Sequence, residues 1–203
     1  MLIEALGWAA AAFGSLVALP QVVKLFQTGS AAGVSLTAWQ AAFGANIAWT
    51  VHGVLGGYTN LWVPNVVFLC CSTLILVRMQ QDRRVGWGRL LVPGLVLGGT
   101  TVALDILAGP VAFAVAALLP ALLAQVAQLH ALFLKPNVGG VSLGYMTMNV
   151  LNQLIWVSWA ALAGESSVIL VGSTLGVMMV VNLLWALLRR FRIVRARLAQ
   201  MHA

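Results

Sequence analysis

The stretch Leu19–Val67 reads LPQVVKLFQTGSAAGVSLTAWQAAFGANIAWTVHGVLGGYTNLWVPNVV. A Pro-Gln pair (Pro20, Gln21) lies near the end of one apolar run, and a short polar turn then leads to the tetrapeptide Gly-Val-Ser-Leu. Two more apolar runs follow, the first with a tryptophan and the second with an asparagine (Trp49, Asn65). Polar side chains inside such runs are costly in a membrane and usually face a bundle interior or a cavity. The stretch therefore predicts helices that enclose a polar site.

The pattern returns 107 positions later in the chain. The tetrapeptide recurs at 140–143, Trp156 corresponds to Trp49, and Gln128 corresponds to Gln21. Four consecutive identities and two tryptophans in register are hard to obtain by chance. The sequence therefore predicts two copies of one helical unit.

Composition indicates that the bilayer is the solvent. Of the 203 residues, 62% are hydrophobic and only 7% are charged, whereas soluble domains carry about 25% charged residues. The apolar runs are continuous and do not alternate as barrel strands would, so helices are predicted. A spanning helix needs about 20 apolar residues. Seven runs qualify: 2–22, 36–56, 60–78, 90–107, 110–132, 142–163 and 167–188.

The distribution of charge predicts the orientation in the membrane. With seven spans, all 11 Lys and Arg residues fall on one side, while most of the acidic residues fall on the other. The positive-inside rule then places the C-terminus in the cytoplasm and the N-terminus outside. The net charge of +7 is thus interpreted as an orientation signal at lipid headgroups rather than as a nucleic-acid site. We expect a multi-pass protein of the plasma membrane.

The repeat predicts how the spans are grouped. Three helices are an odd number, so two copies can share one orientation only if an extra span separates them. The predicted fold is all-α, with two parallel three-helix bundles joined by an inversion linker helix. The predicted segments are a first repeat at 1–84, the linker at 85–109, a second repeat at 110–190 and a basic tail at 191–203.

Polar and aromatic residues in the two repeats are the candidate site. In the first repeat, Asn46 and Trp49 share a helix face, and Asn65 comes from the next helix. The second repeat has Gly172 at the position of Asn65, so a neighbouring hydroxyl is the expected substitute. The candidate substrate-binding residues are Asn46, Trp49, Asn65, Gln153, Trp156, Ser173 and Thr174.

Titratable residues inside the spans are few. His52 is interpreted as bonded to a neighbouring helix, with a proton relay as the less favoured alternative. Asp105 lies near the outer end of its span, where we expect it to be solvated. No cluster of metal ligands, nucleophile–base pair or phosphate-binding loop is evident. We therefore expect no metal, no cofactor and no enzymatic activity.

The Pro20-Gln21 pair, the Gly-Val-Ser-Leu tetrapeptide and the 3+1+3 arrangement resemble the PQ-loop superfamily, and within it the SWEET sugar transporters and the half-size SemiSWEETs. The resemblance implies that Trp49, Asn65 and Trp156 line a central sugar pocket. It also implies hinges at Pro20, Gln21 and Gln128. The chain departs from the family where Ala38, Ala127 and Tyr145 replace hinge prolines.

The expected function is the transport of small sugars by facilitated diffusion. An indole stacks on the apolar face of a sugar ring, and a carboxamide both donates and accepts hydrogen bonds. Because no carboxylate was expected deep in the spans, proton coupling is disfavoured. Alternatives are a proton-coupled carrier of amino acids or other small solutes through His52, and a receptor or adaptor of the PQ-loop type. The oligomeric state is left open, including a homo-oligomer.

Overall fold

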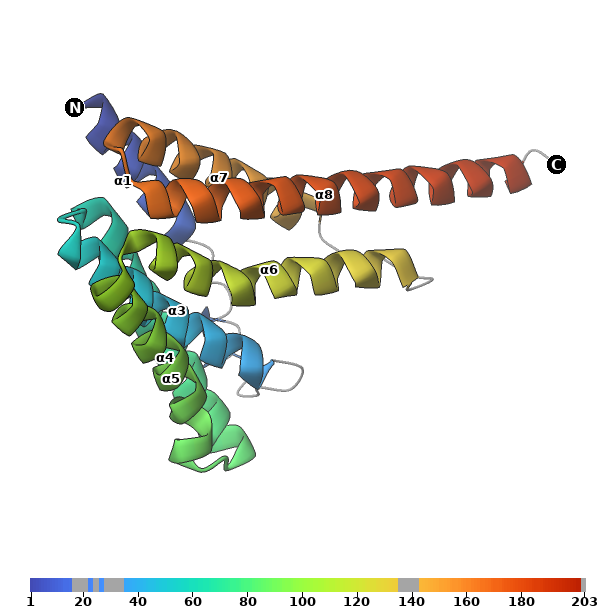
Figure 1. The fold of residues 1–203 in the computed structure, drawn as a ribbon. Coiled ribbons are helices and arrows are strands. Elements are labelled where there is room, and N and C mark those ends of the chain that lie inside the picture. The colour runs from blue at the N-terminus through green and yellow to red at the C-terminus, as the bar shows by residue number, and fades with distance from the viewer. Residues whose placement is uncertain (16–21, 24–25, 28–34, 135–142, 202–203) are drawn as a thin grey trace. The chain divides into compact units, whose positions relative to one another are not determined.

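The computed structural model describes residues 1–15, 22–23, 26–27, 35–134 and 143–201, and the side chains of 127, 131, 145 and 192–201 lie outside this description. Within these ranges every regular element is an α-helix, which confirms the predicted all-α fold (Figure 1). The helices are α1 (Leu2–Ser15), α3 (Leu36–Leu55), α4 (Thr59–Arg83), α5 (Trp87–Ala108), α6 (Pro110–Leu134), α7 (Leu143–Ala163) and α8 (Ser166–Met201).

Each described helix begins within three residues of the start of a predicted span, and α4 and α8 continue beyond the predicted ends. Four of them, α4, α5, α6 and α8, are long and apolar enough to cross a membrane, and the described part of α1 is a shorter apolar helix. Helices α3 and α7 have 20 and 21 residues, but the polar side chains within them lower their hydropathy. The chain is a multi-pass helical membrane protein.

Contacts divide the chain into a first unit, Met1–Ala117, and a second unit, Leu118–Ala203. In the first unit α3 packs along both α4 and α5, and α1 packs against α4. In the second unit α7 packs along α8. The division lies inside α6, so the first turns of that helix belong to the first unit. The predicted segment boundaries stay predictions, and the structure adds that α5 packs with the first unit.

The repeat is visible in the positions of the helices. Helices α7 and α8 begin 107 positions after α3 and α4, and the turns between them contain Gly57 and Gly164, each with φ of 73°. Glycine adopts this left-handed conformation without the steric cost that a Cβ brings. The repeated tetrapeptide also has a local purpose, because Ser35 caps α3 by accepting a hydrogen bond from the Ala38 amide at 3.2 Å.

Helices α3 and α5 approach closely through glycines. Gly44 on α3 faces Gly94 and Gly98 on α5, and a Cβ on Gly98 would lie 2.8 Å from the Gly44 carbonyl oxygen. Ala48 and Thr101 on the same faces are 1% and 3% exposed. Small residues four apart let helix backbones pack closely in lipid, where dispersion and polar contacts drive association. The helix predicted as a linker is thus tightly joined to α3.

A proline in α5 explains a buried glutamine in α3. Pro93 has no N–H, so the Arg89 carbonyl four residues earlier loses its helical donor. The side-chain amide of Gln40 donates to that carbonyl at 2.7 Å and to the Leu90 carbonyl at 2.8 Å. Gln40 is 7% exposed and would be costly to bury without these bonds. The pair Gln40 and Pro93 therefore fixes one end of the α3–α5 interface.

The second unit joins α6 to α8 through three side chains of α8. Asn182 donates to both the backbone and side-chain oxygens of Gln125, at 3.1 and 2.9 Å. Trp185 and Arg189 donate to the Leu132 carbonyl at 3.3 and 2.6 Å. The three residues lie at i, i+3 and i+7 and so share a face of α8. The bonds to Leu132 satisfy a carbonyl in the last turn of α6, which has no donor within the helix.

Helix α8 is the longest element and runs for 36 residues. Its apolar span ends at Phe191, and the helix continues to Met201. The basic tail predicted at 191–203 is therefore helical through Met201.

Candidate functional site

The first-repeat residues of the predicted site lie on α3 and α4. Asn46 is buried, and its side-chain amide donates to the Ala42 carbonyl at 2.6 Å. Asn65 is half-buried and donates in the same way to the Leu61 carbonyl at 2.7 Å. Each amide thus uses one N–H on its own helix. The second N–H and the carbonyl oxygen of a carboxamide remain chemically able to bind a hydroxyl.

Trp49 is half-buried in an aromatic cluster formed with His52 and Phe113. Its ring meets Phe113 edge-on, with centroids 4.8 Å apart and planes at 89°, and meets His52 edge-on at 5.7 Å and 86°. The His52 and Phe113 rings are stacked, with centroids 4.0 Å apart and planes at 6°. Edge-to-face and stacked pairs of this kind stabilise a defined ring orientation. The cluster therefore holds the Trp49 indole in one orientation.

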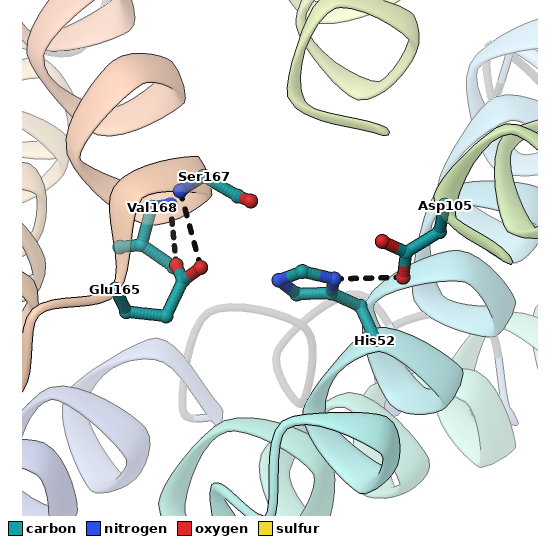
Figure 2. Close-up of polar contacts among 5 residues, drawn as sticks. All are labelled: His52, Asp105, Glu165, Ser167 and Val168. Atoms are coloured by element: carbon teal, nitrogen blue, oxygen red, sulfur yellow. Dashed lines mark hydrogen bonds and ion pairs between the residues drawn. The ribbon is translucent and has the colours of Figure 1, made fainter. Parts of the chain in front are cut away.

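His52 also bonds to a carboxylate from α5. Its Nδ1 lies 2.8 Å from Asp105 Oδ2, and the side chains are 8% and 7% exposed (Figure 2). Because an ionised carboxylate only accepts hydrogen bonds, Nδ1 must carry the proton and donate it. The expectation that Asp105 is solvated is wrong. Its location in the last turn of α5 places it opposite His52, and the two helices pack too closely to leave the carboxylate in water.

The pair bears on proton coupling. Asp105 lies in the last turn of α5, near the expected outer end of its span, but its side chain is only 7% exposed. The structure has a buried carboxylate bonded to the one side-chain type whose charge ordinarily changes near neutral pH. A proton could therefore be held within the first unit.

The second repeat repeats the tryptophan geometry. Trp156 on α7 is half-buried, and its ring meets Trp159 edge-on with centroids 5.6 Å apart and planes at 87°. Trp159 stands at the position equivalent to His52 and is 2% exposed. The two repeats thus support their tryptophans in the same way, although only the first uses a titratable ring.

The structure accounts for the asparagine missing from the second repeat. A Cβ on Gly172 would lie 2.8 Å from Val157 Cγ2, so even alanine would force a neighbour to move. The same Cβ would lie 3.4 Å from Gln153 Oε1. A carboxamide is therefore present beside Gly172, but it is supplied by α7. Gln153 fits the expected role of the missing asparagine better than a hydroxyl of α8 does.

The two hydroxyl residues proposed as substitutes are less well placed. Ser173 is exposed, and the Thr174 hydroxyl donates to the Leu170 carbonyl of its own helix at 2.8 Å. Asn152, which precedes Gln153, has a buried side-chain oxygen that no donor in the described ranges reaches. Buried acceptors of this kind are usually satisfied by a protein group or by ordered water.

The proposed hinge residues are only partly covered. Pro20 and Gln21 lie outside the described residues. Gln128 lies in α6 and is half-buried. The hinge role of all three therefore stays a prediction.

Glu165 is a buried acidic residue that serves its own helix. It is 4% exposed, and its carboxylate accepts hydrogen bonds from the Ser167 and Val168 amides at 3.1 and 2.5 Å (Figure 2). Carboxylates are stabilised at helix N-termini by free amides and by the helix dipole. The structure thus gives Glu165 a capping role at the start of α8.

A comparison with protein families identifies the first repeat. Residues 2–62 match the family model described as PQ loop repeat. These residues are similar to a PQ-loop repeat. The PQ-loop family includes transporters and related membrane proteins, and the match covers the segment that contains Trp49, His52 and the predicted Pro-Gln hinge. No curated protein matches the chain. The SWEET-type form stays a prediction.

Two residues of the candidate site were missed from the sequence. Asp105 could have been found, because an acidic residue inside one span and a histidine inside another both lay near the predicted outer ends. Phe113 is fully buried at the start of α6, and nothing in an apolar run distinguishes it from other core residues. In the part of the chain that the structure describes, no three His, Cys, Asp or Glu residues are grouped as metal ligands.

Proposed function

We propose that the protein is a carrier of small sugars in the plasma membrane that works by alternating access and facilitated diffusion. The observation that carries the proposal is the matched support of Trp49 and Trp156, each half-buried and each packed edge-on against a ring three residues further along its helix. A carboxamide accompanies each indole, from Asn46 in α3 and from Gln153 in α7. Flat apolar faces beside amides suit a sugar ring with its rim of hydroxyls.

The orientation is part of the proposal. Helix α4 ends at Arg83, Arg84 follows in the turn before α5, and Arg89 lies in the first turn of α5. With the basic tail of α8, these charges favour a cytoplasmic C-terminus and an external N-terminus. In transporters built from parallel repeats, solute sites lie near the middle of the membrane. The protein acts without cofactor, metal or nucleic acid, and it is a transporter rather than an enzyme.

A proton-coupled carrier of another small solute is the second candidate. The buried His52–Asp105 pair favours it, because intramembrane carboxylates and histidines commonly form proton pathways. In such a carrier, solute would accumulate against its gradient when protons flow inward.

Uptake into proteoliposomes tests both candidates. A panel of radiolabelled mono- and disaccharides and amino acids is measured with and without a pH gradient. Sugar uptake that reaches equal concentrations on both sides and persists without the gradient supports the sugar carrier. Amino-acid uptake, or accumulation that requires the gradient, would replace it with the proton-coupled carrier. Empty liposomes and liposomes with the Trp49→Ala, Trp156→Ala double variant are the controls.

A further inference from the structure

We infer that His52, Asp105 and Phe113 form a proton-binding site that positions the Trp49 indole, so that solute affinity depends on pH even without a gradient. The inference deepens the proposed function and rests on it for the part that concerns the solute. It concerns binding at equilibrium, and it therefore applies to a facilitated carrier as well as to a coupled one.

The buried carboxylate is the reason that the site needs a proton. Asp105 is 7% exposed, and a buried charge is costly unless a partner compensates it. A neutral His52 still donates one hydrogen bond, but only the imidazolium also cancels the charge of the carboxylate. Proton binding therefore completes an ion pair between α3 and α5.

The aromatic rings favour the same charged form. Phe113 lies parallel to the imidazole with centroids 4.0 Å apart, so its π face is in contact with a ring that becomes cationic. Cations are attracted to the face of an aromatic ring, and the attraction is stronger where water is excluded. Trp49 touches both rings edge-on. A change in the charge of His52 is thereby transmitted to the indole through two ring contacts.

Other charged groups of the first unit do not replace this proton. Arg89 stands 16 residues before Asp105 on α5, about 24 Å along the helix. Glu4 on α1 bonds the amino terminus at 3.4 Å, and its side chain is 79% exposed. Tyr58 lies in the turn before α4, where its ring packs against Gly56. Arg78, Asp82 and Arg83 lie in the last turns of α4, at the end away from that turn, and the first turns of α6 carry no titratable side chain.

The second repeat is a natural reference for this interpretation. Trp159 occupies the position of His52 and supports Trp156 with nearly the same geometry. An indole neither binds a proton near neutral pH nor needs a carboxylate partner. A titratable ring is therefore not required to hold a tryptophan in this orientation. The first repeat adds proton binding at His52 to a geometry that the second repeat achieves without it.

The first test needs no solute. Tryptophan emission of the full chain in lipid nanodiscs is recorded from pH 5.5 to 8.5, and the Trp49→Phe variant is subtracted to isolate Trp49. We expect the Trp49 emission to change with pH and this change to disappear in His52→Gln. Asp105→Asn serves the same purpose if His52→Gln does not fold. A Trp49 emission that is constant with pH, or a change that survives both variants, would overturn the inference.

The second test measures binding of glucose and sucrose, as a monosaccharide and a disaccharide, over the same pH range. Neither probe titrates in this range, so any pH dependence belongs to the protein. We expect affinity to be about threefold to tenfold higher at pH 5.5 than at pH 8.5 in the parent chain, and constant within about twofold in His52→Gln. Asp105→Glu should retain the dependence. A dependence that His52→Gln leaves intact would contradict the proposal.

Matched controls come from residues of the same type elsewhere. His130 on α6 is exposed, so His130→Gln should leave both profiles unchanged. Glu4→Gln removes an exposed carboxylate from α1 and should also have no effect. If neither sugar binds at any pH, the sugar proposal fails, whereas the emission test still decides whether the proton site exists.

Discussion

The two repeats support a tryptophan with the same geometry but different chemistry. Trp49 packs edge-on against His52 and Trp156 against Trp159, with ring separations of 5.7 and 5.6 Å. In the first repeat the supporting ring bonds a buried carboxylate of α5, whereas in the second it is an apolar indole. The difference shows that ring geometry and ring charge can be separated in this fold. The geometry is common to both copies, and the charge is local to the first.

The two repeats also differ in how closely a neighbouring helix packs at equivalent positions. In the first repeat Gly44 on α3 lies against α5, while the equivalent Leu151 on α7 is 46% exposed. A close helix neighbour demands a small residue, and an open face accepts a large one. The predictions below use these differences, beginning with the largest expected effect.

The glycine contact between α3 and α5 should be the most sensitive position. Gly44→Leu would drive a side chain into the backbone at Gly94, and overpacking of this kind costs about 1–3 kcal/mol or more. We expect loss of folded protein in fluorescence-detected size-exclusion chromatography. Gly99→Leu is the control, because Gly99 lies on the partner helix α5 beside Gly98 but has open space around it. Equal tolerance of both variants would contradict the close α3–α5 interface.

Removal of either indole should weaken solute binding strongly. Trp49→Ala and Trp156→Ala each remove one apolar face, and we expect about a tenfold to hundredfold loss of affinity in a binding assay. Phenylalanine at either position should restore part of the affinity because it keeps a flat ring. If only one of the two alanine variants lost affinity, the two repeats would not contribute equivalent surfaces to the site.

The space beside Gly172 provides a smaller test. Gly172→Ala should destabilise the protein by about 1–3 kcal/mol, because its Cβ would lie 2.8 Å from Val157 Cγ2. The additional change Val157→Ala should restore the melting temperature. Gly176→Ala is the control, since its Cβ would make an ordinary contact of 3.5 Å with Gln153. A Gly172→Ala variant as stable as the parent would show that Val157 moves freely.

The smallest expected effect is the coupling energy between Gln40 and Pro93. Gln40→Leu leaves the Arg89 carbonyl without a donor and should cost about 1–3 kcal/mol. In a Pro93→Ala background the restored amide can bond that carbonyl, so the same change should cost about 1 kcal/mol less. The four melting temperatures of the double-mutant cycle measure this coupling. Strictly additive effects would mean that Gln40 does not compensate for the proline.

Most of the fold was predictable because the length of the hydrophobic runs and the internal repeat are properties of the linear sequence. Neither depends on which helices pack together. The helix starts and the two-copy pattern both follow from local spacing. The contact of α5 with α3 was not predicted from the sequence. The sequence of α5 has no copy elsewhere in the chain, so this helix was interpreted only as a connector. Its glycines at 94 and 98 were a signal that could have predicted a close helix neighbour.

Site residues were predictable where they occupy equivalent positions in the two repeats. Residues that contact the site from outside the repeated pattern were not predictable. Trp49 and Trp156 were named because their positions match. The partners of His52 come from α5 and from the first turns of α6, neither of which belongs to the repeated pattern. Gln153 was also named as a candidate, but its position beside Gly172 was not predictable, because the 107-residue offset only places a glycine opposite Asn65.

Helix α8 has a practical consequence for imaging this protein. Its 36 residues extend about 54 Å, whereas the hydrocarbon core of a bilayer is about 30 Å thick. The last turns therefore continue beyond the lipid as an uninterrupted helix, held at its base where Arg189 bonds the end of α6. A soluble helical protein fused in register after Met201 would project stiffly from the micelle. Such a fusion would give a small, nearly featureless membrane protein the alignment marker that single-particle electron microscopy requires.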